Sequence, residues 1–513
     1  MNSRLVSAFD AVSRSSDRAL TDQRGDSSFV EVGIRARTLA DALLSLGLGG
    51  ARVALLGQPD RDWVDGFWAI VLAGGCVVPL SPLHPAPERH ALLAQSRARA
   101  LLVSETMSAE FTEHTGAMLF GGGRVLSAAA PTGHAPGCSR SGKAAAGDPE
   151  HAAALLLYTS GTTGRPKGVS LSHFNVFEGI RALTEAWQIT SHDRLLHTLP
   201  LHHLHGICVA LLTAQCAGAA TTFLARYSAA AVLEAVPGST LLMGVPTQHQ
   251  RLLEHLEMLP ERERQAHAAE LSRLRLITSG SAKLPERVGR RLEQLSGQYP
   301  LERYGMTEVG IVISNPLFGA RLAGSPGRPL PGYGIRIVDE LGRDAGPGEP
   351  GEIWIQGASV FAEYDADPES TSAAFESGYF KSGDTAAWTP DGNVRILGRT
   401  SVDIIKSGGY KLSAIEIEEQ VRAHPWVEDV AVVGLPDDLW GERVVAVVIP
   451  NAQGRIQVEQ DGQRALEELK AWLRQRMAGY QVPKTLSWWD QLPRNALGKV
   501  QKVELIAELG RRT

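Results

Sequence analysis

The sequence predicts an α/β protein: a large N-terminal domain of doubly wound βα layers with a small β-barrel, followed by a small α+β domain. Apolar segments with strand character alternate with amphipathic helical segments to about residue 330. From residue 331 to about residue 398, short strands are bounded by Gly and Pro, which indicates a small antiparallel barrel. Because 513 residues exceed the size of one hydrophobic core, we expect about two to four domains.

The first part of the chain supports the parallel sheet element by element. Helices are expected at residues 35–48, 62–73 and 88–99, and strands at 53–57, 76–80 and 101–104. This order of strand, helix and strand is typical of βαβ units. Residues 128–150, which are rich in Ala, Pro, Gly and Ser, are expected to form a loop or a disordered segment.

The alternation continues after this segment. Strands are expected at residues 152–157, 194–201, 221–224, 241–246 and 274–278, and helices at 173–187, from Thr247 onward and at 285–295. The strand at 194–201 runs into residues 202–206, which include three histidines. If this run is extended, His203 and His205 share one face and His202 points the other way.

The last part of the chain no longer alternates strand and helix in the same regular way. Strands at 335–338, 352–356 and 394–397 are expected to form the barrel. Beyond Asp403 we expect a helix at 414–424, strands at 430–433 and 444–449, and a helix at 464–477. These elements predict a compact α+β domain of about a hundred residues.

Composition places the chain among soluble globular proteins. Hydrophobic residues make up 43% and charged residues 21% of the chain, and the net charge of −5 argues against a nucleic-acid partner. The four cysteines form no C-x-x-C pair, so neither a zinc site nor a disulfide scaffold is indicated. We see no signal peptide and no apolar segment long enough to span a bilayer, so we expect a cytoplasmic protein without a membrane partner.

The most informative stretch covers residues 158–169, directly after the strand expected at 152–157. Its glycines let the backbone approach a ligand closely, successive N–H groups form an anion-binding concavity, and Lys167 adds positive charge. The pattern is not the common P-loop, because Pro166 precedes the lysine and Gly168 follows it. We therefore expect a polyphosphate ligand rather than an ordinary Gly/Thr-rich surface turn.

This stretch resembles the phosphate-binding loop of the adenylate-forming enzymes, which include acyl-CoA synthetases, the adenylation domains of peptide synthetases and luciferase-type enzymes. Further motifs of that superfamily follow in its order, at residues 303–308, 379–384, 398–411 and 493–499. Taken singly, these motifs have ordinary structural explanations, such as a helix start, a turn or a solvated surface pair. Together, the motifs between residues 158 and 499 identify the superfamily.

The resemblance implies a site for ATP and Mg²⁺. Thr307 would meet the α-phosphate, Glu308 would help to hold Mg²⁺ together with Thr159, and Asp384 would accept hydrogen bonds from the ribose hydroxyls. Arg399 would contact the ribose, although one residue more than in the commonest pattern separates it from the hinge. The residues assigned to the nucleotide are Thr159, Ser160, Gly161, Thr162, Thr163, Gly164, Lys167, Gly280, Ser281, Tyr304, Gly305, Met306, Thr307, Asp384, Arg399 and Lys499.

The resemblance also implies a reaction in two halves. Lys499 would bridge the attacking carboxylate and the α-phosphate, because a placed cation relieves the repulsion between two anions. Residues 399–403, centred on Asp403, would be the hinge between a large domain at 1–398 and a mobile C-terminal domain at 404–513. Gly408 and Gly409 would give that domain a close backbone approach to coenzyme A.

Residues 197–206, with Glu302 and Arg303 before Tyr304, resemble the malonyl-CoA synthetase branch. In that branch cations meet the far carboxylate of a short diacid. Arg303 and Arg251 are the candidates here, and a structural ion pair is the alternative for each. A fatty acid would leave a buried Arg303 unpaired, which costs about 3–5 kcal/mol, whereas malonate would not.

The histidines have different expected roles. His203 is expected to gate the acyl pocket, His205 to line it, and His202 to be structural. Metal ligation is the alternative, but no carboxylate or cysteine completes a zinc set with familiar spacing. The residues expected to act in catalysis are thus Lys499, Thr307, Glu308 and His203.

The sequence therefore predicts an ATP-dependent acid–CoA ligase of the malonyl-CoA synthetase type, which acts as a monomer or homodimer on a dicarboxylic acid. Some tolerance of methylmalonate is expected, because one methyl group is worth only about 1–3 kcal/mol. The alternatives are an acyl- or aryl-CoA synthetase, an enzyme that loads a carrier protein, and a nucleotide-binding scaffold without turnover.

Overall fold

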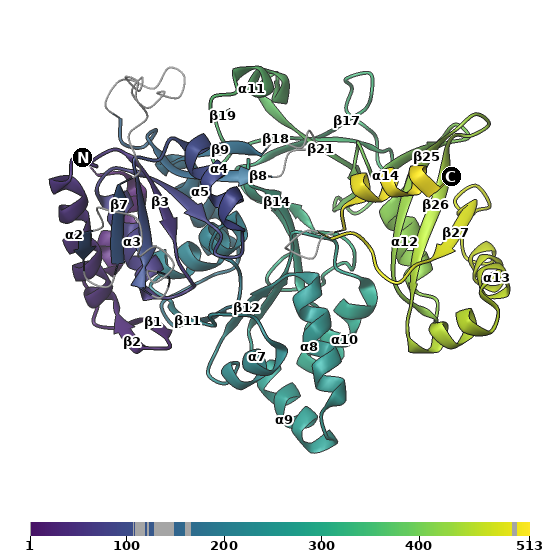
Figure 1. The fold of residues 1–513 in the computed structure, drawn as a ribbon, viewed down its shortest axis with the longest axis horizontal. Coiled ribbons are helices and arrows are strands. Elements are labelled where there is room, and N and C mark those ends of the chain that lie inside the picture. Colours follow the sequence, from purple (N-terminus) through teal and green to yellow (C-terminus); the bar gives the residue numbers. More distant parts are fainter. Residues whose placement is uncertain are drawn as a thin grey trace.

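The computed structural model describes residues 2–105, 107, 118–120, 123–127, 148–159, 166–494 and 500–512. A large N-terminal part, purple to green in Figure 1, carries a smaller C-terminal part, yellow-green to yellow, on one side. The N-terminal part contains two large sheets and one small antiparallel sheet, and the C-terminal part is built on a fourth sheet. This arrangement confirms the expected α/β class. In the described part of the chain, no helix combines the length and apolar character needed to cross a bilayer.

The first large sheet has a parallel centre. Strand β3 pairs in parallel with both β4 and β5, and β4 pairs in parallel with β8. In spatial order its strands are β19 (Glu363–Tyr364), β9 (Lys167–Ser172), β8 (Ala153–Thr159), β4 (Cys76–Leu80), β3 (Arg52–Leu56), β5 (Ala100–Ser104), β7 (Gly123–Ser127) and β6 (Met118–Phe120).

The second large sheet is parallel from β1 to β14 through its centre. In spatial order its strands are β16 (Arg328–Pro329), β15 (Gly310–Ser314), β14 (Leu301–Met306), β13 (Leu276–Ser279), β12 (Leu241–Gly244), β10 (Arg194–His197), β11 (Ala220–Phe223), β1 (Arg18–Asp22) and β2 (Gly25–Ser28).

Helices cover both faces of the two large sheets. Buried residues of both sheets and of the helices α1, α2, α3, α5 and η2 form one continuous core. The outer face of the first sheet packs against α4, and that of the second sheet against α7 and α8, with α10 packed on α8. The helices are α1 (Arg4–Val12), α2 (Phe29–Ser45), α3 (Arg61–Leu72), α4 (Ala86–Ser96), α5 (His173–Ala186), η2 (His205–Leu212), α6 (Thr213–Cys216), α7 (Ala229–Ala235), α8 (Pro246–Met258), α9 (Glu261–Leu271) and α10 (Glu286–Ser296).

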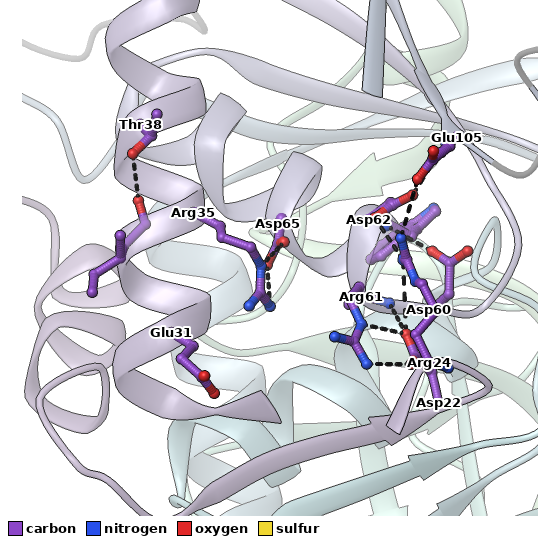
Figure 2. A network of polar contacts seen from close by, with 12 residues as sticks. Asp22, Arg24, Glu31, Arg35, Thr38, Asp60, Arg61, Asp62, Asp65 and Glu105 are labelled. Carbon is purple, nitrogen blue, oxygen red and sulfur yellow. Dashed lines mark hydrogen bonds and ion pairs between the residues drawn. The ribbon is translucent and has the colours of Figure 1, made fainter. Parts of the chain in front are cut away.

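An ion-pair network joins the two large sheets away from the loops described below (Figure 2). Arg61 opens α3, and its Nε lies 2.9 Å from the Asp22 carboxylate at the end of β1. Arg24, in the turn between β1 and β2, lies 2.6 Å from the carboxylate of Asp62 on α3. Both pairs connect a helix of the first sheet to the edge of the second.

The small antiparallel sheet lies next to the first large sheet. Its ladder runs through β17 (Gly334–Val338), β18 (Gly351–Gln356), β21 (Tyr379–Trp388) and β20 (Phe375–Glu376), and β22 (Val394–Arg399) also pairs with β21. All of its pairings are antiparallel, as the sequence predicts. Helix α11 (Pro368–Ala374) precedes β20.

The C-terminal part packs helices on both faces of one sheet. Alternate residues of β25 face opposite sides: Val430 and Val432 pack with α12 and α13, whereas Ala431 and Val433 pack with α14. The elements are β23 (Ile404–Ser407), β24 (Tyr410–Ser413), α12 (Ala414–Arg422), β25 (Val427–Asp437), β26 (Gly441–Pro450), α13 (Ala452–Arg474), β27 (Thr485–Trp488) and α14 (Lys502–Arg512).

Two expectations about these elements are wrong. The helix expected at 35–48 begins at Phe29, because Ser28 and Glu31 form a capping box there. The run at 202–206 is not extended: β10 ends at His197, and His205 opens the π-helix η2. The helix expected at 464–477, by contrast, is present as the second half of α13: the backbone is non-helical at Asp461, whose carboxylate accepts a hydrogen bond from the Arg464 N–H, and a separate helical stretch from Ala452 precedes it.

Parts of the expected pattern lie outside the described residues. These are most of the segment expected as a loop at 128–150, residues 160–165 of the phosphate stretch, and residues 495–499, which include Lys499.

Candidate active site

The two ends of the phosphate stretch form an antiparallel hairpin. Thr159 ends β8, Lys167 begins β9, and the two residues pair directly across the ladder. The Thr159 hydroxyl donates to the Lys167 carbonyl at 3.4 Å. Ser160, Gly161, Thr162, Thr163 and Gly164 lie between them, outside the described residues.

Tyr364 connects this hairpin to Glu308. The Tyr364 hydroxyl donates to Glu308 Oε1 at 3.1 Å, and Lys167 Nζ lies 5.0 Å from the centre of the Tyr364 ring. Strand β19, which carries Tyr364, pairs with β9, so the backbone fixes this contact. Lys167 and Glu308, which come from separate motifs, therefore lie around one aromatic ring. No sequence pattern indicated a role for Tyr364.

Glu308 lies in the tight turn between β14 and β15, next to Thr307. Its side chain is buried, and burial raises the pKa of the carboxyl group. The Phe361 N–H donates to the Glu308 carbonyl at 2.8 Å, which fixes the turn. At Gly305, just before it, a Cβ atom would lie 1.9 Å from the Gly310 carbonyl oxygen, so the turn requires glycine. Met306 packs against the main core.

Asp384 lies at the centre of a second cluster. It pairs directly with Arg399 across β21 and β22, and Arg399 Nε lies 3.1 Å from Asp384 Oδ1. The Tyr304 hydroxyl donates to Asp384 Oδ2 at 2.6 Å. The structure thus brings together three residues that separate motifs assign to the nucleotide, and Arg399 lies beside Asp384 despite the additional residue before the hinge.

Arg303 is a buried cation. Its exposed fraction is 6%, and no described residue forms a hydrogen bond with its Nε or Nη2 atom. Within the part of the chain that the structure describes, no carboxylate forms an ion pair with it. Burial therefore lowers the pKa of its guanidinium to about 9. The preceding Glu302 points to the opposite face of β14 and accepts a hydrogen bond from the Gly324 N–H at 2.9 Å.

The residues that follow β13 form the floor under Arg303. A Cβ atom at Gly280 would lie 2.3 Å from Arg303 Cζ, so the guanidinium lies directly against this glycine. The Ser281 hydroxyl lies 3.3 Å from His205 Nδ1, and its backbone has a positive φ of 68°. Gly280 and Ser281 therefore contact the arginine and histidine of the expected acid pocket.

His205 and His203 add further unpartnered nitrogens. The Nε2 atoms of both side chains are buried, and neither has a hydrogen-bond partner among the residues that the structure describes. Burial lowers the pKa of His203 to about 4 and that of His205 well below its usual value, and the charge of Arg303 lowers the latter further. Both imidazoles are therefore neutral near pH 7, so they present hydrogen-bonding groups without adding charge.

His202 does not point away from His203, as an extended strand would require. Its ring centre lies 4.1 Å from that of His203 and 5.5 Å from that of His84. Among the residues with described placement, no group of three or more His, Cys, Asp or Glu side chains could hold a metal ion.

Helix α8 positions a histidine that the sequence reasoning missed. His249 is buried, and its Nε2 lies 3.0 Å from the Thr278 carbonyl oxygen. The buried residues 249, 252, 253 and 256 follow a helical period that could have indicated it. Arg251 lies off this face and is exposed. The structure describes no contact between Arg251 and Arg303, so its role in the acid pocket stays a prediction.

The expected hinge and coenzyme A residues lie at the start of the C-terminal part. Asp403 is buried between the two parts and precedes β23. Gly408 and Gly409 form the β23–β24 turn with φ values of 58° and 84°, a region that favours glycine. A Cβ atom at Gly408 would lie 3.0 Å from the Trp440 ring.

Comparisons with known proteins agree with this geometry. Residues 9–365 match the family described as AMP-binding enzyme, and residues 416–499 match the AMP-binding enzyme C-terminal domain. The chain is 37% identical to the mitochondrial malonate–CoA ligase ACSF3 of Bos taurus, over 96% of this chain and 88% of that protein. The solved structure of ATP-bound MatB from Rhodopseudomonas palustris is 31% identical, covers 99% of both chains and gives a TM-score of 0.83. The solved apo structure of MatB from the same organism is 30% identical over 100% of both chains and gives a TM-score of 0.75. The chain belongs to the AMP-binding enzyme family.

Proposed function

We propose that this AMP-binding enzyme is a malonate–CoA ligase, which converts malonate, ATP and coenzyme A to malonyl-CoA, AMP and diphosphate. The observation that carries the proposal is the buried guanidinium of Arg303, which has two unpartnered nitrogens. The malonate–CoA ligases among its relatives support the same substrate.

The chemistry of Arg303 favours a diacid over a monoacid. A guanidinium presents its N–H groups as a planar fork that matches a carboxylate, and such charge-assisted bonds are strong. One carboxylate of malonate would satisfy this fork while the other reacts with ATP. A monoacid of similar length would place a methyl group there and leave a buried charge unpaired, at a cost of about 3–5 kcal/mol.

The neutral histidines suit the same ligand. Nε2 of His203 and of His205 is buried and unpartnered, and a neutral imidazole can donate one hydrogen bond to a carboxylate oxygen. His203 would lie at the entrance of the pocket, and His205 would line it beside Ser281. Because neither histidine is charged near pH 7, the single positive charge of Arg303 matches the single distal carboxylate.

The first half-reaction joins two anions. A carboxylate oxygen of malonate forms a bond to the α-phosphorus of ATP, and the bond from that phosphorus to the bridging oxygen breaks to release diphosphate. Lys499 would lie between the two anions, Lys167 and the phosphate hairpin would hold the phosphates, and Thr307 would contact the α-phosphate. Preorganised positive groups lower the barrier because they need not reorient as the charge moves.

The nucleoside would be held by the second cluster. Asp384 can accept two hydrogen bonds from the ribose diol, and Arg399 and Tyr304 already fix the orientation of its carboxylate. Gly280, Gly305 and Met306 would line the path between the nucleotide and the acid.

The residues near Glu308 fit a magnesium ion. Mg²⁺ usually takes one or two protein carboxylates, several waters and phosphate oxygens. Glu308 offers a buried carboxylate with one hydrogen bond from Tyr364, and the nearby hairpin end offers the Thr159 hydroxyl. When bound, the ion would neutralise phosphate charge.

The second half-reaction transfers the acyl group to the thiol. The coenzyme A thiolate attacks the acyl carbonyl of malonyl-AMP, a C–S bond forms, the bond from carbon to the phosphate oxygen breaks, and AMP leaves. We infer that the C-terminal part rotates about Asp403 between the halves, withdrawing Lys499. Gly408 and Gly409, which have no side chains, would then approach the thiol.

A substrate panel tests the proposal. AMP and diphosphate release should require coenzyme A and malonate, with weaker turnover of methylmalonate and little with acetate, octanoate or an aromatic acid. Equal turnover of octanoate would contradict the diacid pocket. Thioester formation only on a carrier protein would assign a different acceptor.

A further inference from the structure

Lys502 lies buried between two carboxylates at the boundary of the two parts. It opens α14, three positions after Lys499. Its Nζ lies 2.5 Å from Asp403 Oδ1 and 2.7 Å from Glu418 Oε1, and 12% of its side chain is exposed. Burial alone would lower the pKa of this ammonium, but the two carboxylates raise it, so the group stays charged.

The Asp403 carboxylate bonds to both sides of the expected hinge. Its Oδ2 accepts a hydrogen bond from the Arg399 N–H at 2.8 Å, at the end of β22, where the expected hinge leaves the N-terminal part. Its Oδ1 contacts Lys502 in the C-terminal part. A Cβ atom at Gly398, where φ is 130°, would lie 2.4 Å from Asp403 Cβ, so this close fit requires glycine.

The Glu418 contact is of a different kind. Glu418 lies on α12, and its Oε1 also accepts a hydrogen bond from the Val432 N–H of β25 at 2.8 Å. Both neighbours belong to the C-terminal part. The Lys502–Glu418 pair therefore lies inside one part, whereas the Lys502–Asp403 pair crosses the boundary.

Lys502 is firmly connected to the C-terminal sheet and to the base of the segment that holds Lys499. Leu505 and Leu509 of α14 are buried against β25 and β26. The Gln501 N–H donates to the Pro493 carbonyl at 2.8 Å, and Arg494 and Val500 form an antiparallel bridge. These contacts join residues 493 and 494 to residues 500 and 501, directly before Lys502.

We propose that Lys502 is a positioning residue for adenylate formation, which holds Asp403 and thereby the domain arrangement that places Lys499 at the reacting carboxylate. The proposal rests on the two-step reaction proposed above. Rotation about Asp403 cannot preserve both of its bonds, because Arg399 and Lys502 lie on opposite sides of the rotation point. The Lys502–Asp403 pair thus stabilises one arrangement. The whole chain gives a higher TM-score with the ATP-bound relative (0.83) than with its apo form (0.75), and on this ground the proposal places the arrangement at the adenylate-forming stage.

The test is to measure the two half-reactions separately in Lys502→Met. Acid-dependent exchange of diphosphate into ATP reports adenylate formation, and malonyl-CoA formation from supplied malonyl-AMP reports the second half. Exchange should fall about tenfold, a typical size for the loss of one coupled contact, while the second half changes less than about twofold. Equal losses in both halves, a loss in the second half alone, or unchanged exchange would overturn the proposal.

Glu418→Gln is the matched control. It removes one of the two carboxylate charges beside Lys502 but leaves the Asp403 contact. It should therefore lower the melting temperature without changing the ratio between the rates of the two half-reactions. Asp403→Asn should shift the ratio as Lys502→Met does, and the double variant should show no further shift. If Glu418→Gln shifts the ratio equally, Lys502 is a general structural residue and the proposal is wrong.

Two further measurements keep the outcome decisive. Lys502→Arg retains the charge, so exchange should recover to within about threefold of the wild type even if Lys502→Met folds poorly. Failure of this rescue in a folded protein would also overturn the proposal. Absence of malonate-dependent exchange in the wild type would reject malonate instead, and the same ratios would then be measured with the acid that supports exchange.

Discussion

The guanidinium of Arg303 lies directly against the backbone of Gly280, where a Cβ atom would lie 2.3 Å from Arg303 Cζ. Residue 280 follows β13 and residue 303 lies on the adjacent strand β14, so the parallel sheet brings them together. Only a glycine at position 280 leaves room for the guanidinium here. Among the described residues, the Nε and Nη2 atoms of Arg303 have no hydrogen-bond partner. Under the proposed function, the direction of this side chain decides which acid the enzyme accepts.

Gly280→Ala should displace the guanidinium and weaken the use of malonate. Because the added methyl group cannot coexist with Arg303 in this position, we expect kcat/KM for malonate to fall about 10- to 100-fold, which corresponds to about 1.4–2.7 kcal/mol. The KM for ATP should change much less. Steady-state diphosphate release gives both constants.

Gly462→Ala on α13 is the matched control, because a Cβ atom there meets only Val458 at 3.6 Å, an ordinary contact. It should leave both constants unchanged. A loss of ATP affinity equal to the loss of malonate activity in Gly280→Ala would place this glycine in the nucleotide site instead.

Arg303→Leu should separate stability from activity. The change removes a buried charge without a partner, so the ligand-free enzyme should melt at a higher temperature than the wild type. Malonate turnover should fall at least about 100-fold, because the distal carboxylate would meet an apolar surface. Turnover of butyrate, whose terminal methyl group fits that surface, should rise relative to malonate.

Differential scanning calorimetry and the substrate panel check both halves of this prediction. A lower melting temperature together with unchanged malonate kcat/KM would mean that Arg303 has a structural partner and does not contact the acid.

Glu302 should make the stability of the enzyme depend on pH. Burial raises the pKa of this carboxyl group from 4.5 to about 7, although the Gly324 N–H and nearby Lys283 oppose the shift. The folded state therefore binds a proton more tightly than the unfolded state. Stability from this group is complete below about pH 4.5 and is lost as the pH rises through about 7. The full difference is about 3 kcal/mol.

Glu302→Gln isolates this contribution, because its amide oxygen can still accept from Gly324 and other titrating groups cancel in the comparison. The wild type should lose stability relative to the variant as the pH rises from 4.5, the ordinary pKa of the group, to about 7, its pKa in the folded protein. Urea unfolding at several pH values measures this difference. Parallel curves for both proteins would show that Glu302 titrates normally.

Lys499→Ala should abolish adenylate formation and spare the second half-reaction. Removal of a cation that bridges two anions in the transition state should cost about 100-fold or more in the first half. Thioester formation from supplied malonyl-AMP should remain within about threefold of the wild type, because Lys499 would be withdrawn at that stage. Loss of both halves to the same extent would mean that the lysine is misassigned.

Much of the fold follows from local sequence patterns. The strands of the first sheet and the helices on it are apolar or amphipathic segments of ordinary length, and most lie within a few residues of their expected positions. The errors occur where local pattern carries no information. The strand expected at 194–201 ends at His197. Gly206, in the π-helix that follows, lies so close to Pro200 that a Cβ atom there would be 2.2 Å from the Pro200 carbonyl oxygen.

The site was predictable only in part. Motif residues such as Asp384 and Arg399 are recognisable in the sequence, and the structure brings them together. Residues that support them from distant segments leave no signature: Tyr364 reaches Glu308 from β19, and Lys502 reaches Asp403 from α14. That no carboxylate of the described residues pairs with Arg303 is likewise a result of packing, which a sequence pattern does not report.

The most direct test of the central claim is a crystal structure of the enzyme with malonate and AMP. One malonate carboxylate should accept hydrogen bonds from Nε and Nη2 of Arg303, at the donor–acceptor distances of about 2.7–2.9 Å typical of charge-assisted bonds, while the other faces the α-phosphate. A guanidinium turned toward solvent, or paired with a protein carboxylate away from the ligand, would contradict the account.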